Sequence, residues 1–281
     1  MKYSNEICRA TTLKYYESYL INHIYPYFGH KILCDITLED IENYKTLKKQ
    51  QGLTVKTVNN HISLLGTIIS KYNSDFKIKK EEYSKKESEI IYLEKEQIKN
   101  LLKLAKTSYP DFYPLILTAI NTGITRSEIL ALQWDDINWN DFTITVNKSI
   151  FHGKFLSHKT KYSKREVNVS QAVLNELNKW QNACPKGEHN LVFPSPAGEI
   201  YDPDNMIKRK FIPLCRKAGI ENLKFCDMRD NYAALLIKLN FPLTYVQQQL
   251  GHSSVNVTAE RYKKIIEQNF VLDFNTLEAI F

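Results

Sequence analysis

The sequence predicts a mainly α-helical protein with one small antiparallel β-sheet, an α+β fold divided into two domains. Apolar residues recur at steps of three and four over most of the chain, which is the period of an amphipathic helix. Only two stretches, 142–150 and 165–170, alternate apolar and polar residues as strands do. A charged segment without an apolar period, residues 77–90, is predicted to be a linker between domains of residues 1–76 and 91–281.

Residues 1–76 are predicted to form a small helical bundle. The helical period runs over residues 11–27, and Pro26 and Gly29 break it. A second helix is expected to begin after Thr37 and a third after Thr54, because threonine is a preferred N-cap residue. The third helix carries an apolar stripe: Val58, Ile62, Leu65, Ile68 and Ile69.

Residues 91–281 begin with two predicted helices, 92–106 and 111–123, and Gly123 is expected to terminate the second. The two alternating stretches then predict the sheet. The segment between them, 151–164, is rich in polar residues and is expected to form turns. From Ser170 onward the helical period returns. The second domain is therefore predicted to be mostly helical around a short sheet.

Composition limits the classes of function. The net charge of +7 favours a polyanionic partner. No apolar run approaches the roughly 20 residues of a membrane span, and the N-terminus lacks a signal peptide core, so a cytoplasmic protein without membrane contact is expected. The five cysteines are odd in number and have no paired spacing, which favours reduced thiols over a zinc site or a disulfide framework.

Three motifs in order along the chain resemble the tyrosine recombinase (phage integrase) family. They are TGITRSEILALQWDDI, KTKYSKREV and LGHSSVNVTAERY. Residues 1–76 resemble the helical, SAM-like core-binding domain of integrases from phages and conjugative elements. The resemblance covers nearly the whole chain, and the arm-binding domain that many such integrases carry is expected to be absent.

This resemblance implies a defined chemistry. A tyrosine hydroxyl attacks a DNA phosphodiester, holds the 3′ phosphate covalently and releases the 5′ oxygen, without a metal or other cofactor. Charge that develops on the phosphate oxygens calls for arginine donors, because guanidinium groups bind phosphate in two-pronged fashion. A general acid must also protonate the leaving oxygen.

Four residues match the catalytic positions of the family. Tyr262 is implied to be the nucleophile and His252 a phosphate donor. Arg229 matches the second catalytic arginine, and Lys159 best matches the lysine that acts as general acid. The neighbouring basic residues are expected to contact the DNA backbone; these are Lys161, Lys164 and Arg165.

Two catalytic positions are degenerate. The family pattern places its first catalytic arginine where this chain has Thr125. Arg126 falls in the next, variable position and is kept as a candidate substitute, although neighbouring helical residues point about 100° apart and only a local change in the turn brings Arg126 to the phosphate. Cys226 replaces the histidine of the His-x-x-Arg motif, and Asp230 stands where a histidine commonly follows the arginine. An aspartate here opposes the phosphate if it points inward, or faces solvent.

Two functions follow from different classes. One is a site-specific recombinase that integrates or excises a mobile element and is either active or slowed by the loss of the first catalytic arginine at Thr125. The other is a catalytically decayed relative that serves as a DNA-binding or assembly protein. A type IB topoisomerase shares the chemistry, but the integrase-like first domain argues against it.

The implied partners are double-stranded DNA at attachment or core sites and further copies of this chain, as a tetramer on DNA. The resemblance also admits accessory DNA-bending factors. The cluster Lys208, Arg209 and Lys210 is a further candidate for DNA contact. The apolar tail of residues 265–281 is expected to dock on a neighbouring protomer or on its own domain.

Overall fold

The computed structural model describes residues 10–73, 75–82, 90–157 and 162–269. The chain divides into two compact units, Met1–Ser88 and Glu89–Phe281. Within the described ranges, no helix is long and apolar enough to cross a membrane.

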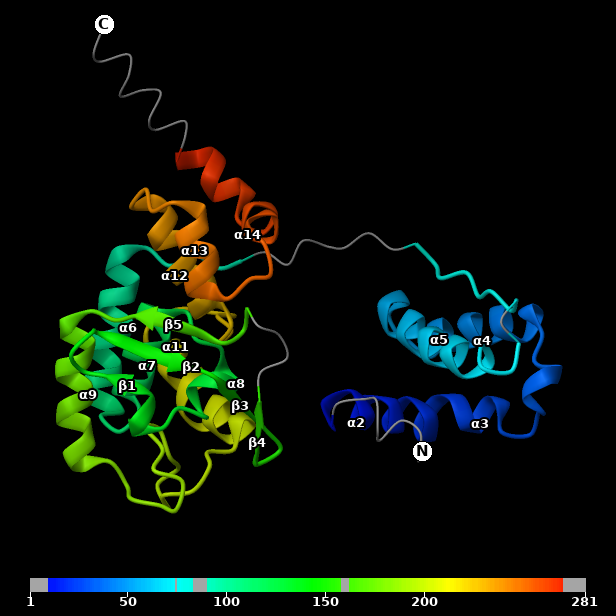
Figure 1. The fold of residues 1–281 in the computed structure, drawn as a ribbon, viewed down its shortest axis with the longest axis horizontal. Coiled ribbons are helices and arrows are strands. Elements are labelled where there is room, and N and C mark those ends of the chain that lie inside the picture. Colours follow the sequence, from blue (N-terminus) through cyan, green and yellow to red (C-terminus); the bar gives the residue numbers. More distant parts are fainter. Residues whose placement is uncertain (1–9, 74, 83–89, 158–161, 270–281) are drawn as a thin grey trace, which may run out of the picture. The chain divides into compact units, whose positions relative to one another are not determined.

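The first unit is a bundle of helices around one apolar core (Figure 1). Its elements are α2 (Ala10–Tyr19), the π-helical turn η1 (Leu20–Ile24), α3 (Tyr25–Phe28), the short η2 (Leu33–Asp35), α4 (Leu38–Gln50) and α5 (Val55–Ile69). Four of the five residues in the predicted stripe of α5 are buried, and Ile68 is half-buried. Thr37 and Thr54 cap α4 and α5, as predicted.

Of the two predicted breaks, Gly29 caps the end of the first helix, whereas Pro26 does not end it. The helix continues from Ala10 to Phe28 because it widens to a π-turn, η1, directly before the proline. A proline has no N–H for the helical ladder, and a π-turn lets the chain pass it without a break. The second unit repeats this arrangement, where the π-turn η4 precedes Pro213.

Part of the segment predicted as a linker is bonded to the first unit. The side chain of buried Lys45 donates to the carbonyl oxygen of Lys79 at 2.7 Å. The amide of Asn59 and the backbone of Glu81 exchange two hydrogen bonds, of 2.8 and 3.1 Å. Polar residues of α4 and α5 thus hold this charged stretch although it has no apolar period.

The second unit packs helices against a three-stranded antiparallel sheet of order β1–β2–β5. Its helices are α6 (Lys95–Ser108), α7 (Tyr113–Thr122), α8 (Arg126–Ile129), η3 (Trp134–Asp136), α9 (Gln171–Ala183), α10 (Pro203–Met206), η4 (Ile207–Phe211), α11 (Ile212–Lys217), α12 (Asp227–Lys238), α13 (Leu243–Leu250) and α14 (Val255–Arg261). Its strands are β1 (Ile137–Asn138), β2 (Thr143–Val146), β3 (Lys148–Phe151), β4 (Lys154–Ser157) and β5 (Arg165–Asn168).

The strand prediction needs one correction. The alternating stretch 142–150 is two strands, since β2 pairs with β5 whereas β3 pairs with β4 in a separate hairpin. Residues 154–157, predicted as turn, are therefore strand. The tight turn of this hairpin is made by His152 and Gly153, both with positive φ, which is the geometry that two-residue hairpin turns require.

Helices α12, α13 and α14 form a separate apolar cluster at one end of this unit, beside β5 (Figure 1). The side-chain oxygen of buried Gln249 on α13 accepts from the backbone N–H of Asn168 at 2.9 Å. The backbone carbonyl oxygen of Gln249 accepts from Arg165 Nε at 2.8 Å. These bonds fix α13 against the sheet and so fix the turn that follows it.

Candidate active site

Tyr262 follows α14 and lies inside the α12–α14 cluster with only 1% of its surface exposed. Its hydroxyl donates to Oδ1 of Asp230, at 2.8 Å. Burial, and after it the negative charge of Asp230, raise the pKa of Tyr262 above its usual value. The tyrosine is therefore held as a neutral phenol with its proton directed at a carboxylate.

Asp230 does not face solvent, because it is 2% exposed and points at α14. Arg261 donates to both of its oxygens, from Nε to Oδ1 and from Nη2 to Oδ2, each at 2.8 Å. The hydrogen bond to Asp230, its largest cause, raises the pKa of Arg261 further above its usual range. Asp230, Arg261 and Tyr262 thus form one hydrogen-bonded group, here termed the Asp230 triad.

Arg229 is fixed by the ends of two helices. Its Nη1 donates to the carbonyl oxygen of Gly123 at 2.9 Å, and its Nη2 donates to that of Leu250. A guanidinium has five N–H donors, so this anchoring leaves its plane set and further donors available for an anion. Burial, and next the charge of Arg165, lower the pKa of Arg229 to about 10, which keeps it charged at neutral pH.

Gly123 ends α7, as predicted, with a φ of 61°. A Cβ at this position would lie 2.7 Å from a ring atom of Tyr232, so both the backbone conformation and the space require glycine. The glycine is what lets the carbonyl of this turn reach Arg229.

His252 lies one residue beyond the glycine that ends α13. Its Nδ1 is 2.8 Å from Oγ1 of Thr258, and its ring is stacked 6.4 Å from the ring of Tyr262. Burial first, then the charges of Arg229 and Arg261, lower the pKa of His252 to about 4. The imidazole is thus neutral at pH 7, and a neutral imidazole has one N–H to donate.

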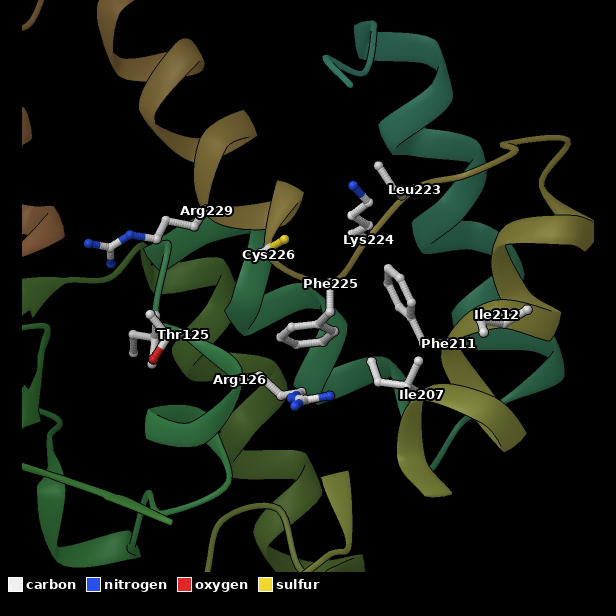
Figure 2. Close-up of a pocket in the computed structure, with 11 residues that line it drawn as sticks. Thr125, Arg126, Ile207, Phe211, Ile212, Leu223, Lys224, Phe225, Cys226 and Arg229 are labelled. Carbon is white, nitrogen blue, oxygen red and sulfur yellow. The ribbon is translucent and has the colours of Figure 1, made fainter. Parts of the chain in front are cut away.

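The degenerate position Thr125 is the N-cap of α8, where its backbone N–H donates to Oε2 of Glu128 at 2.9 Å. Arg126 does not join Arg229. The exposed guanidinium of Arg126 lies 3.5 Å from Asp204, and Figure 2 shows the Arg126 and Arg229 side chains directed away from each other. Arg126 therefore does not take the place of the missing arginine at position 125, as expected because neighbouring helical residues point about 100° apart.

A cavity of about 440 Å³ lies beside this position (Figure 2). Thr125, Cys226 and Arg229 line part of it, and the rest is lined by Arg126, Lys224 and apolar residues, mainly of η4 and the turn before α12. The two residues that replace the family's arginine and histidine therefore border open space next to Arg229. Burial, and then the charge of Asp227, raise the pKa of Cys226, so its thiol is a weak donor.

Arg165, which is predicted to contact the DNA backbone, is bonded to Glu128 in this structure. Its side chain is 6% exposed, and both terminal nitrogens donate to Glu128, at 3.0 and 3.1 Å. Burial alone would raise the pKa of Glu128, but the hydrogen bonds and charge of Arg165, with the N–H of Thr125, lower it to about 2. The pair joins β5 to α8 beneath the active-site residues.

The other basic residues of the hairpin region are placed unequally. Lys164 is exposed next to Arg165, as a DNA contact requires. Lys159 and Lys161 lie outside the described residues, as does most of the tail predicted to dock. Sequence reasoning also missed Arg261, because a basic residue next to a tyrosine carries no signal of its own until the fold places Asp230 opposite it.

Comparison with known proteins identifies the class that this fold and cluster define. The chain belongs to the phage integrase family, a family of tyrosine recombinases, whose model matches residues 92–268. It is 27% identical over 270 residues to the ICEBs1 integrase of Bacillus subtilis (strain 168), covering 88% of this chain and 73% of the relative. It is 25% identical to a XerC-like tyrosine recombinase of Caldanaerobacter subterraneus subsp. tengcongensis, covering 97% and 78%.

Solved structures share the fold. The integrase of transposon Tn1549, in complex with transposon right end DNA, superimposes with a TM-score of 0.77 at 18% identity, covering 93% of this chain and 92% of that one. A lambda integrase dimer bound to a core site gives a TM-score of 0.66 at 15% identity, covering 91% and 89%. The mainly helical fold with small antiparallel sheets is therefore that of the tyrosine recombinases.

Proposed function

We propose that this protein is a site-specific DNA recombinase that cleaves and rejoins DNA strands through a 3′-phosphotyrosyl intermediate on Tyr262. The observation that carries the proposal is the meeting of three predicted residues from separate elements. Buried Tyr262 after α14 has the half-buried His252, which follows α13, stacked at 6.4 Å, and the half-buried Arg229 of α12 is close enough for its charge to act on the tyrosine.

Each side chain in this cluster has a role that its contacts support. Tyr262 supplies the oxygen that attacks phosphorus. Arg229 presents a fixed positive charge to the phosphate oxygens, where charge grows in the transition state. The neutral His252 adds one hydrogen bond. Lys159, outside the described residues, is proposed as the donor of the proton to the departing 5′ oxygen.

The reaction is proposed to be slow because Thr125 supplies no positive charge. Removing one donor from a prearranged oxyanion site costs a factor of about 10² to 10³ in rate. Arg126 is the nearest arginine in sequence, but it is turned toward Asp204 and must leave that exposed ion pair to take part. An exposed pair of this kind contributes only about 0–1 kcal/mol, so the ion pair is a weak restraint.

A second function, a DNA-binding or assembly protein without cleavage, is supported by two of the same observations. Thr125 occupies the position of the family's first catalytic arginine. Tyr262 is buried, and its hydroxyl is bonded to Asp230. Both functions share duplex DNA as partner, which the charge of +7 favours. In both, the first unit is proposed to bind core DNA, and copies of the chain are proposed to assemble on DNA as a tetramer.

The deciding experiment uses nicked suicide duplexes from the DNA that flanks the coding gene. Covalent protein–DNA adduct is measured on denaturing gels for the unmodified chain, Thr125→Arg and Tyr262→Phe. Adduct from the unmodified chain that Tyr262→Phe abolishes supports the recombinase. Binding without adduct from either the unmodified chain or Thr125→Arg would sink it and leave the binding protein. Binding itself should weaken steeply as salt rises, because phosphate contacts release counterions.

A further inference from the structure

The Asp230 triad raises a question that the proposed function leaves open, which is where the proton of Tyr262 goes. A phenol attacks phosphorus only as it loses its proton. In the described part of the chain, the group bonded to the Tyr262 hydroxyl is Oδ1 of Asp230, at 2.8 Å, within the reach that proton transfer requires.

The other candidates in the cluster are turned elsewhere. The Nδ1 of His252 is bonded to Thr258, and the ring lies parallel to that of Tyr262, at 6.4 Å. The thiol of Cys226 is directed at Asp227, with Sγ 3.7 Å from Oδ1. Arg229 and Arg261 carry no acceptor. Geometry therefore selects the carboxylate.

The carboxylate is also oriented as a catalytic base must be. Arg261 holds both oxygens through two hydrogen bonds of 2.8 Å, and these fix the plane of the carboxylate against α14. A nucleophile bonded to a base that a third group orients is the arrangement by which enzymes activate hydroxyl nucleophiles. Here the third group, Arg261, is the residue directly before the nucleophile, so one short segment of chain carries both.

We propose that Asp230 is the general base of strand cleavage, an inference that rests on the proposed function. Oδ1 of Asp230 takes the proton of Tyr262 as the Oη–P bond forms and the P–O5′ bond breaks. The 5′ oxygen takes its proton from a different group. In rejoining, the 5′ hydroxyl gives its proton back to that group as the P–O5′ bond forms, and Asp230 returns its proton to Oη as the Oη–P bond breaks.

The surroundings of Tyr262 favour a base that stays bonded to it during attack. Burial and the charge of Asp230 both raise the pKa of Tyr262 and so disfavour a free phenolate. Proton transfer during attack is therefore favoured over ionisation beforehand. As the proton reaches Asp230, the negative charge passes to the phosphate, toward Arg229, and Arg261 remains bonded to the neutralised carboxyl.

The test measures single-turnover adduct formation on two nicked duplexes, one with an ordinary scissile phosphate and one with a 5′-bridging sulfur. The sulfur leaves without protonation, so the second duplex removes the need for a general acid and retains the need for a base. Asp230→Asn should form adduct about 10²- to 10⁴-fold more slowly than the parent chain on both duplexes, with unchanged DNA binding. Asp227→Asn, a buried carboxylate on the same helix, is the matched control and should keep the parent rate.

Asp230→Ala provides a second measurement, because added acetate or formate can enter the space left by the side chain. A base role predicts that acetate, the more basic anion, restores more adduct than formate. If instead Asp230 only packs α14 in place, neither anion restores the rate.

The outcomes separate the two proposals. Adduct from the parent chain, with Asp230→Asn at the parent rate or faster, overturns the base and assigns Asp230 a restraining role. A defect that vanishes on the sulfur duplex also overturns it, because Asp230 then acts at the leaving group. Failure of the parent chain and of Thr125→Arg to form adduct on either duplex overturns the proposed function and the base together.

Discussion

Restoring an arginine at position 125 should increase strand cleavage by about 10²- to 10³-fold, the factor that one charged donor in an oxyanion site contributes. The cavity of about 440 Å³ beside Thr125 and Arg229 gives the longer side chain room without displacing the core. Thr125 also caps α8, and loss of a threonine cap costs about 1 kcal/mol, or about 2–4 °C in Tm for a unit of this size. Thr125→Arg is thus expected to be faster and slightly less stable.

The assay is single-turnover adduct formation on the nicked duplex, with thermal unfolding measured on the same samples. Thr125→Gln is the matched control, because its side chain is polar and long but uncharged. It should share the loss of stability without the gain in rate. Equal rates for Thr125→Arg and Thr125→Gln would refute the reasoning, since the gain would then owe nothing to a positive charge near Arg229.

Three further predictions concern the stability of the two units. Gly251→Ala should destabilise the second unit by about 1–3 kcal/mol, because φ is 69° and a Cβ would lie 2.8 Å from the Tyr162 carbonyl oxygen. Urea unfolding followed by tryptophan fluorescence measures this loss, and an unchanged midpoint would contradict it. Glu128→Gln should cost about 3–5 kcal/mol at pH 7, because it leaves Arg165 buried beside a neutral amide. The pKa of Glu128 is lowered to about 2, so the Arg165–Glu128 pair stabilises the fold above pH 4.5, and this stabilisation is lost as pH falls toward 2. The stabilities of the parent chain and of Glu128→Gln, measured as a function of pH, should therefore converge near pH 2. Parallel stability curves would argue against the pair. In the first unit, burial lowers the pKa of His61 to about 4, so protonation favours the unfolded chain. The stability of this unit should therefore fall by about 1–3 kcal/mol between pH 6.5 and 4. Hydrogen exchange in α5 measures this loss, and His61→Gln should make the stability less dependent on pH.

Local signals in the sequence predict much of the fold. Thr37 and Thr54 cap helices, and Gly123 ends one, because these residues act on their own backbone. The sequence does not reveal the β3–β4 hairpin, because its turn, His152–Gly153, has two positive φ angles but lacks a strong hairpin motif. The predicted break at Pro26 is wrong for a related reason, because the π-turn that accommodates this proline has no apolar pattern in the sequence.

In the site, too, the sequence predicts the residues but not their contacts. Tyr262, Arg229 and His252 are found from motifs, whereas their contacts depend on pairs distant in sequence. The Arg165–Glu128 pair joins residues 37 positions apart, and the Asp230–Tyr262 pair joins residues 32 apart. A sequence motif gives no distance between such groups. For this reason Asp230 was predicted to oppose the phosphate or face solvent, whereas the fold directs it at the nucleophile.

The most direct test of the central claim is to locate the covalent bond to DNA. The unmodified protein is trapped on a nicked duplex, digested with nuclease and protease, and the peptides are analysed by tandem mass spectrometry. We predict a nucleotide remnant attached through phosphate to Tyr262 and to none of the other 16 tyrosines. A remnant on a different residue, or none despite DNA binding, would contradict it.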